Sequence, residues 1–148
     1  MKVSQLMSRK LITVRPQDSV ETAVALLRQR GVRHLLVIDK KELVGIISDR
    51  DIKRALDPQK RGKKKLMSLG GLYFLLEPFF VREIMTRDVV SVEPDLSAQE
   101  AASIMVAERF GALPVVRNGE LIGIVTETDL LRYFAKAEVA TDSKLSKR

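Results

Sequence analysis

The sequence predicts an α/β fold of the α+β kind, in which two copies of one βαββα unit pack about a pseudo-two-fold axis. An internal repeat carries this prediction: superposing Met7 on Met85 aligns the two halves without a gap. Each half also alternates short aliphatic runs with helical patterns, as strands and helices in one unit do. With 148 residues the chain is long enough for two small units but too short for two large domains.

The repeat keeps apolar positions on apolar positions over most of its length. It ends in both copies with a glycine, two aliphatic residues and a Ser or Thr, and an aspartate follows three residues later. The matched segments are residues 3–9 with 81–87, 11–16 with 89–94, 43–48 with 121–126, and Asp51 with Asp129.

Each copy is predicted to begin with a short strand that stops at a proline, because proline has no N–H for a paired central strand. A helix follows, whose start is marked by two residues with capping-box spacing and, in the first copy, whose end is marked by Gly31. The strands are residues 11–14 and 89–92, and the capping pairs are Asp18 with Glu21 and Ser97 with Glu100.

A hairpin and a second helix complete each copy. Asn118-Gly119 is a strong signal for a two-residue hairpin turn. The predicted strands are residues 35–38 and 113–116, followed by strands that start at Leu43 and Leu121, and the helices lie near residues 49–56 and 127–136. The copies therefore span residues 1–56 and 81–136. Residues 57–80 form a basic and apolar insert, and residues 137–148 a polar, flexible tail.

Composition restricts the function. The chain has no Cys and a single His, so a disulfide framework, a thiolate metal site and a cysteine nucleophile are excluded, and we expect no metal site and no catalytic residue. No apolar run approaches the length of a membrane span, and the N-terminus lacks a secretion signal, so we expect a cytoplasmic protein. The net charge of +7 favours anionic partners.

The paired Ser48/Asp51 and Thr126/Asp129 are the candidate functional motif. On spacing alone, a Ser or Thr with an acid three residues later is a helix capping box. Capping boxes prefer the longer Glu or Gln, however, and both copies carry Asp. A carboxylate also suits a vicinal diol, since its two oxygens can each accept a hydrogen bond.

This arrangement resembles a tandem pair of CBS domains, also called a Bateman module, and the resemblance covers the chain from Met1 to about Lys136. It implies a regulatory module without enzymatic activity, without a prosthetic group and with a homodimeric assembly. The regulatory ligand would be AMP, ADP, ATP or S-adenosylmethionine, bound in a cleft between the two copies, and the regulated protein is not identified.

The resemblance also assigns residues to the ligand. Asp51 and Asp129 would hold the ribose hydroxyls, with Ser48 and Thr126 beside them. Thr13 and Ser91 would offer main-chain groups to the adenine edge. The start of the second strand would line each site, with Arg33 and His34 on the phosphate in one copy and the uncharged Gly111 and Ala112 in the other, so we expect two unequal sites. The lone His34 is equally consistent with an ordinary strand-end histidine.

Two other functions remain open. A basic cluster in the insert could bind nucleic acid through phosphate contacts; it consists of Lys60, Arg61, Lys63, Lys64 and Lys65. No recognition motif accompanies this cluster, and solvated linkers are often equally basic. The fold could also serve only as a dimerisation scaffold, with an apolar run of residues 72–76 and 79–80 covering a partner.

Overall fold

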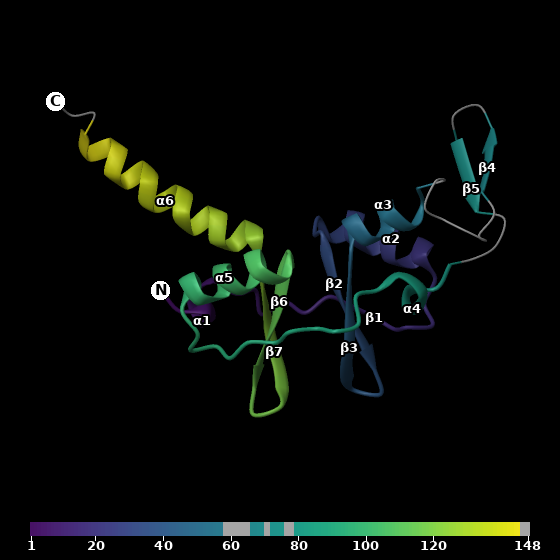
Figure 1. Cartoon of the computed structure of the whole chain (residues 1–148), viewed down its shortest axis with the longest axis horizontal. Helices are drawn as coiled ribbons and strands as arrows, with labels where there is room; N and C mark the ends of the chain where they lie inside the picture. The colour runs from purple at the N-terminus through teal and green to yellow at the C-terminus, as the bar shows by residue number, and fades with distance from the viewer. Residues whose placement is uncertain (58–65, 70–71, 76–78, 146–148) are drawn as a thin grey trace. The chain divides into compact units, whose positions relative to one another are not determined.

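The computed structural model describes residues 1–57, 66–69, 72–75 and 79–145, and its α+β class is the predicted one (Figure 1). The chain divides into two compact units. One is the continuous unit, Ile12–Val89, and the other is the split unit, which joins Met1–Leu11 to Val90–Arg148. The first residues of the chain therefore belong to the unit that holds the second sequence copy.

The continuous unit contains a three-stranded sheet in the order β1-β2-β3. In it β1 runs parallel to β2, and β2 and β3 form an antiparallel hairpin. The basic insert lies partly outside the described residues, but two of its segments pair as antiparallel strands that were not predicted. The elements are β1 (Thr13–Val14), α2 (Val20–Arg30), β2 (His34–Asp39), β3 (Glu42–Ser48), α3 (Asp49–Ala55), β4 (Leu66–Leu69), β5 (Leu72–Leu75) and α4 (Val81–Ile84).

The split unit repeats this plan around a two-stranded hairpin. Its elements are α1 (Val3–Leu6), α5 (Ala98–Glu108), β6 (Ala112–Arg117), β7 (Glu120–Thr126) and α6 (Glu127–Leu145). The turn between β6 and β7 has positive φ at Asn118 and Gly119, as the sequence predicted. The equivalent turn of the continuous unit takes the same conformation with two lysines, Lys40 and Lys41.

Residues 89–92 do not form the predicted strand: only Val92 makes a bridge, to Val115. In the continuous unit the N–H of Leu36 donates to the carbonyl of Ile12, at 3.1 Å, and β1 pairs with β2. The position equivalent to Leu36 is Pro114, which has no N–H to donate. Because this one hydrogen bond is missing, the second copy has only the isolated bridge of Val92, whereas the first copy has the strand β1.

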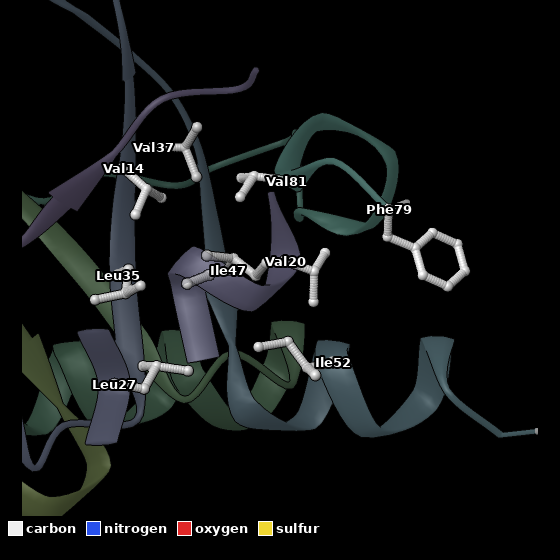
Figure 2. Packing of buried hydrophobic residues seen from close by; sticks show 10 residues of the cluster. Val14, Val20, Leu27, Leu35, Val37, Ile47, Ile52, Phe79 and Val81 are labelled. Carbon is white, nitrogen blue, oxygen red and sulfur yellow. The ribbon is translucent and has the colours of Figure 1, made fainter. Parts of the chain in front are cut away.

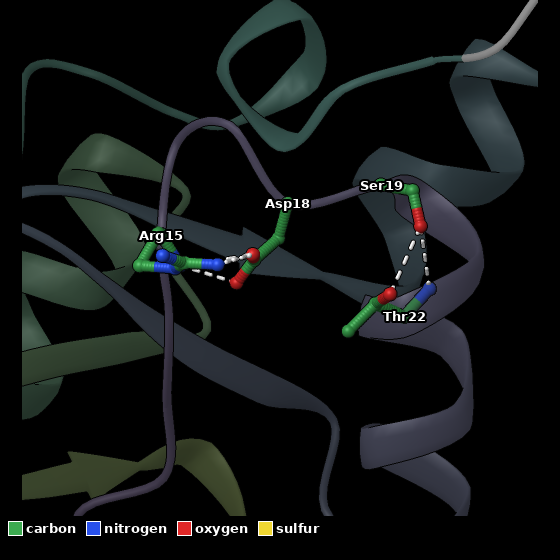
Figure 3. A network of polar contacts seen from close by, with 4 residues as sticks. All are labelled: Arg15, Asp18, Ser19 and Thr22. Atoms are coloured by element: carbon green, nitrogen blue, oxygen red, sulfur yellow. Dashed lines mark hydrogen bonds and ion pairs between the residues drawn. The ribbon is translucent and has the colours of Figure 1, made fainter.

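The start of α2 also differs from the prediction. Its N-cap is Ser19, whose hydroxyl accepts from the N–H of Thr22 at 3.1 Å (Figure 3). Asp18 instead accepts from the backbone N–H and the guanidinium of Arg15, and so closes the turn that precedes the helix. In α5 the predicted capping box is present, since Ser97 and Glu100 bond each other's backbone N–H.

Helix α6 continues well beyond the predicted end at Lys136 and reaches Leu145, within the segment we expected to be a flexible tail. The sequence Ala135-Lys136-Ala137-Glu138 consists of strong helix formers, and neither Gly nor Pro interrupts the chain from there to Leu145. No helix among the described residues is long and apolar enough to cross a membrane.

Each unit's core is completed by a short helix from the other sequence copy. Fully buried Val81 of α4 lies in the cluster formed by Val14, Val20, Leu27, Leu35, Val37, Ile47, Ile52 and Phe79 of the continuous unit (Figure 2). In the split unit, fully buried Val3 of α1 packs with Val92, Ala101, Met105, Leu113, Val115 and Val125. The two copies have therefore exchanged their first segments, which the sequence reasoning did not predict.

The exchanged segments are fixed by backbone pairing at a glycine. Ser8 and Ile124 exchange two backbone hydrogen bonds, at 2.8 and 3.0 Å, beside Gly123 of β7. A Cβ at Gly123 would lie 2.6 Å from the sulfur of Met7 and 2.9 Å from the carbonyl oxygen of Ser8. Gly45 of β3 has the same relation to Met85 and Thr86. The glycine of the repeated motif is thus required by the close approach of this segment.

The exchange predicts which methionine couples energetically to which glycine. Gly123→Ala should lower the free energy of unfolding by about 1–3 kcal/mol, as overpacking does, because the Ser8 carbonyl cannot rotate away. Met7→Ala should relieve part of this loss, so that in urea denaturation the double variant is more stable than the sum of the single effects.

The matched control uses the twin methionine. Met85→Ala should add to Gly123→Ala without coupling, because Met85 contacts Gly45 in the other unit. Coupling to Met85 in place of Met7 would mean that the segments are not exchanged.

Candidate functional site

The predicted site residues gather at one end of the sheet in each unit, at two equivalent places that we call the Ser48 corner and the Thr126 corner. Each corner consists of a strand end, the start of the next helix and the start of the preceding strand. The Ser48 corner contains Thr13, Arg33, His34, Ser48 and Asp51, and the Thr126 corner contains Ser91, Gly111, Ala112, Thr126 and Asp129.

The hairpin register brings these residues together. His34 is the register partner of Ser48, and the carbonyl of Arg33 accepts from the N–H of Asp49 at 3.0 Å. Thr13 pairs with Leu36, two residues along β2 from His34. The start of β2, the end of β3 and the start of α3 therefore converge with β1 at one edge.

The Thr126 corner repeats this register. Ala112 pairs with Thr126, and the carbonyl of Gly111 accepts from the N–H of Glu127 at 3.0 Å. Ser91 differs from its counterpart Thr13 because it lies outside any strand, next to the bridge residue Val92. All ten predicted residues thus lie in two equivalent sets of five, one set in each unit.

Asp51 forms a capping box, as the spacing alone predicted. Its Oδ2 accepts from the backbone N–H of Ser48 at 2.9 Å and from the Ser48 hydroxyl at 3.0 Å. The same hydroxyl accepts in return from the N–H of Asp51 at 3.1 Å. These bonds hold the start of α3 and fix the carboxylate in one orientation.

Asp129 forms the same box with Thr126, and its Oδ2 accepts from the Thr126 N–H at 2.8 Å and from its hydroxyl at 3.0 Å. Neither carboxylate points into bulk solvent: Asp51 is half-buried, and the side chain of Asp129 is only 15% exposed. In each aspartate Oδ2 already accepts two hydrogen bonds, so Oδ1 is the oxygen that the cap leaves open.

The two corners differ in their remaining charges. Oδ1 of Asp129 lies 3.6 Å from a guanidinium nitrogen of Arg132, an ion pair that the sequence reasoning did not consider although the two residues are one helical turn apart. No residue in the described part of the chain makes an equivalent contact with Oδ1 of Asp51. Arg33 and Arg50 have the uncharged counterparts Gly111 and Thr128, so the Ser48 corner is the more cationic of the two.

The two corners also differ in how far their residues are exposed to solvent. Thr13 and Arg33 are exposed and His34 is half-buried, whereas Ala112 is buried and Gly111 half-buried. Among the residues that the structure describes, no group of three or more His, Asp or Glu side chains is placed to bind a metal ion. The Ser48 corner thus combines the open Oδ1 of Asp51 with the exposed side chain of Arg33, and Asp49 adds a second carboxylate in the first turn of α3.

Comparison with known proteins agrees with the repeated architecture. The family model for the CBS domain matches residues 3–58 and again residues 81–136. Inosine-5'-monophosphate dehydrogenase of Korarchaeum cryptofilum is 40% identical over 82% of this chain, but the chain spans only 22% of that protein's length.

Two solved structures that contain ligands resemble more than nine-tenths of the chain. The CBS domain pair of protein MJ0100, in complex with 5'-methylthioadenosine and S-adenosyl-L-methionine, is 28% identical with a TM-score of 0.75, over 93% of this chain and 98% of the other. CBSX2 in complex with AMP is 30% identical with a TM-score of 0.70, over 91% and 97%. Together with the two matches to the family model, these similarities show that the chain belongs to the CBS domain family, as a tandem CBS pair.

Proposed function

We propose that this chain is a regulatory module that binds an adenine nucleotide, with the ribose held at the Ser48 corner and its equivalent at the Thr126 corner. The observation that supports this most directly is that Asp51 caps α3 with one carboxylate oxygen and leaves the other open. Its Oδ2 is held by the cap, so Oδ1 is kept in place as an acceptor for a ribose hydroxyl. An acceptor fixed in advance loses little conformational entropy when a ligand binds.

The ligands of the related structures share the moiety that this arrangement fits. Methylthioadenosine, S-adenosylmethionine and AMP all contain adenosine, and they differ in charge at the 5' position. The proposal therefore assigns the ribose to the aspartates and the 5' substituent to the residues that differ between the corners. Arg33 and His34 would contact the phosphate, and exposed Thr13 would face the adenine edge.

A regulatory function fits the chemistry of the corners better than catalysis does. A carboxylate fixed by a cap and a nearby arginine bind a ligand, but they supply neither an activated nucleophile nor a metal-bound water. In this proposal the module passes its ligand state to another protein. Its similarity to a dehydrogenase of which it spans only 22% is consistent with such a role.

Asp51→Asn tests the ribose contact. The side-chain oxygen of Asn can still accept the cap hydrogen bonds, whereas its NH₂ group replaces Oδ1 by a donor. Because a hydrogen bond to a charged group contributes about 1.5–3 kcal/mol, AMP binding at this corner should weaken about ten- to a hundred-fold in isothermal titration calorimetry.

Glu100→Gln is the matched control, since Ser97 and Glu100 form the same kind of capping box away from both corners. It should leave AMP affinity unchanged. If neither AMP, ADP, ATP nor S-adenosylmethionine binds the wild-type chain, the proposal is wrong. Equal losses in both variants would show that Asp51 acts only through stability.

Replacing Arg33 by Gly and His34 by Ala gives the Ser48 corner the residues of its twin. This double variant should bind AMP about ten-fold more weakly while its affinity for uncharged adenosine stays the same, because only the phosphate interacts with the lost charge. Arg28→Ala, an exposed arginine on α2, serves as the control for net charge. A parallel loss of adenosine binding would contradict a phosphate-specific role.

A further inference from the structure

One basic side chain distinguishes the Thr126 corner from its twin. Oδ2 of Asp129 accepts from the N–H and the hydroxyl of Thr126, at 2.8 and 3.0 Å, and Oδ1 is the oxygen that the cap leaves open. A guanidinium nitrogen of Arg132 lies 3.6 Å from this Oδ1. The carboxylate of Asp129 is thus engaged at both oxygens, at one by its own cap and at the other by a cation.

The twin corner has an arginine at the equivalent position but lacks the ion pair. Arg54 follows Asp51 at the same spacing, yet in the described part of the chain no cation lies within ion-pair distance of Oδ1 of Asp51. The neighbouring residues give the reason. Arg50 lies four residues before Arg54 on α3, and like charges at this spacing repel each other. The residue four positions before Arg132 is the uncharged Thr128, so nothing of this kind opposes the ion pair in α6.

The ion pair changes what the Thr126 corner offers to a ligand. The side chain of Asp129 is largely shielded from solvent, whereas that of Arg132 is 62% exposed and can swing away. A carboxylate oxygen whose charge is partly neutralised by a cation is a weaker acceptor for a neutral hydroxyl, and the guanidinium takes up space in front of it. A ligand hydroxyl at Oδ1 of Asp129 therefore has to displace Arg132 or share the oxygen with it.

We propose that Arg132 sets the ligand affinity of the Thr126 corner, because it competes with the ribose hydroxyl for Oδ1 of Asp129. This inference rests on the proposed function, since it requires the ribose to bind the open oxygen of each aspartate. The Ser48 corner has no such competitor and fills first, and the Thr126 corner fills at a higher ligand concentration. Because one partner of the ion pair is exposed, the competition changes the dissociation constant by only about two- to five-fold.

Adenosine is the probe for this competition, because it is uncharged and responds to Arg132 through Asp129 and not through a phosphate. Asp51→Asn weakens the Ser48 corner, so in this background calorimetry reports the Thr126 corner. Arg132→Ala should then tighten adenosine binding about two- to five-fold, whereas Arg132→Lys, which keeps a cation, should stay close to the unchanged chain. An adenosine affinity that is equal or lower in Arg132→Ala would overturn the proposal.

Ionic strength gives a second readout, which a merely structural role of Arg132 would not move. Salt screens an ion pair with an exposed partner, so in the Asp51→Asn background adenosine affinity should rise between about 0.02 and about 0.5 M NaCl. Arg132→Ala should remove this rise. A rise of the same size with and without Arg132 would contradict the competition.

Arg54→Ala is the matched control, measured together with Asp129→Asn so that the Ser48 corner is reported. Arg54 does not pair with Asp51, so adenosine affinity at this corner should stay the same. An equal gain at both corners would mean that Arg132 acts through net charge, and the proposal would be wrong.

The proposed function and this inference fail in different ways. A wild-type chain that binds neither adenosine nor AMP would overturn both. A chain that binds adenosine at both corners, with no response to the Arg132 variants, would overturn this inference alone.

Discussion

The close backbone approach at Gly45 and Gly123 is the constraint on which the rest of this structure depends. At each glycine a segment from the other sequence copy lies against the hairpin, where a side chain larger than hydrogen would displace it. Behind each segment a short helix puts a valine, Val3 or Val81, into the core of that unit. Neither unit therefore has a complete core from one copy alone, and the chain must pass between the units at residues 11–12 and 89–90.

The same close backbone approach also positions the Ser48 and Thr126 corners. The backbone pairs at Ile46 and Ile124 lie two residues before Ser48 and Thr126, so the strand end is held on its outer edge just before the helix begins. From there the hydroxyl and carboxylate bond each other's backbone N–H, and the aspartate is held in one orientation. A group that first appears to be a helix cap thus also presents one carboxylate oxygen at a fixed position. The structural and the ligand-binding interpretations of the Ser/Thr–Asp pair are compatible, because they use different oxygens.

The local elements were predictable where a short-range signal decides them. The hairpin at Asn118-Gly119, the helix stop at Gly31 and the capping box of Ser97 and Glu100 depend on residues a few positions apart, and all three are present. The strand predicted at residues 89–92 was wrong, because it was inferred from the repeat alone and Pro114 lacks the N–H that the equivalent Leu36 donates. The prediction that Asp18 caps α2 was wrong, because Ser19 is the N-cap and the carboxylate of Asp18 binds Arg15 instead.

The exchange could not have been predicted from the repeat itself. Since Met7 and Met85 are equivalent, as are Gly45 and Gly123, alignment leaves open whether each methionine packs in its own copy or in the other. The pairing of His34 with Ser48 and of Ala112 with Thr126 follows from the hairpin register, which the turn determines. The restriction of each aspartate to one open oxygen required coordinates, since it depends on which oxygen the cap engages.

A crystal structure of the chain soaked with AMP tests the account most directly. It should show a ribose hydroxyl within hydrogen-bond distance of Oδ1 of Asp51, with Oδ2 still bonded to Ser48 and the phosphate beside Arg33. A nucleotide bound elsewhere, or one at this corner that leaves Oδ1 of Asp51 without a hydroxyl partner, would contradict it.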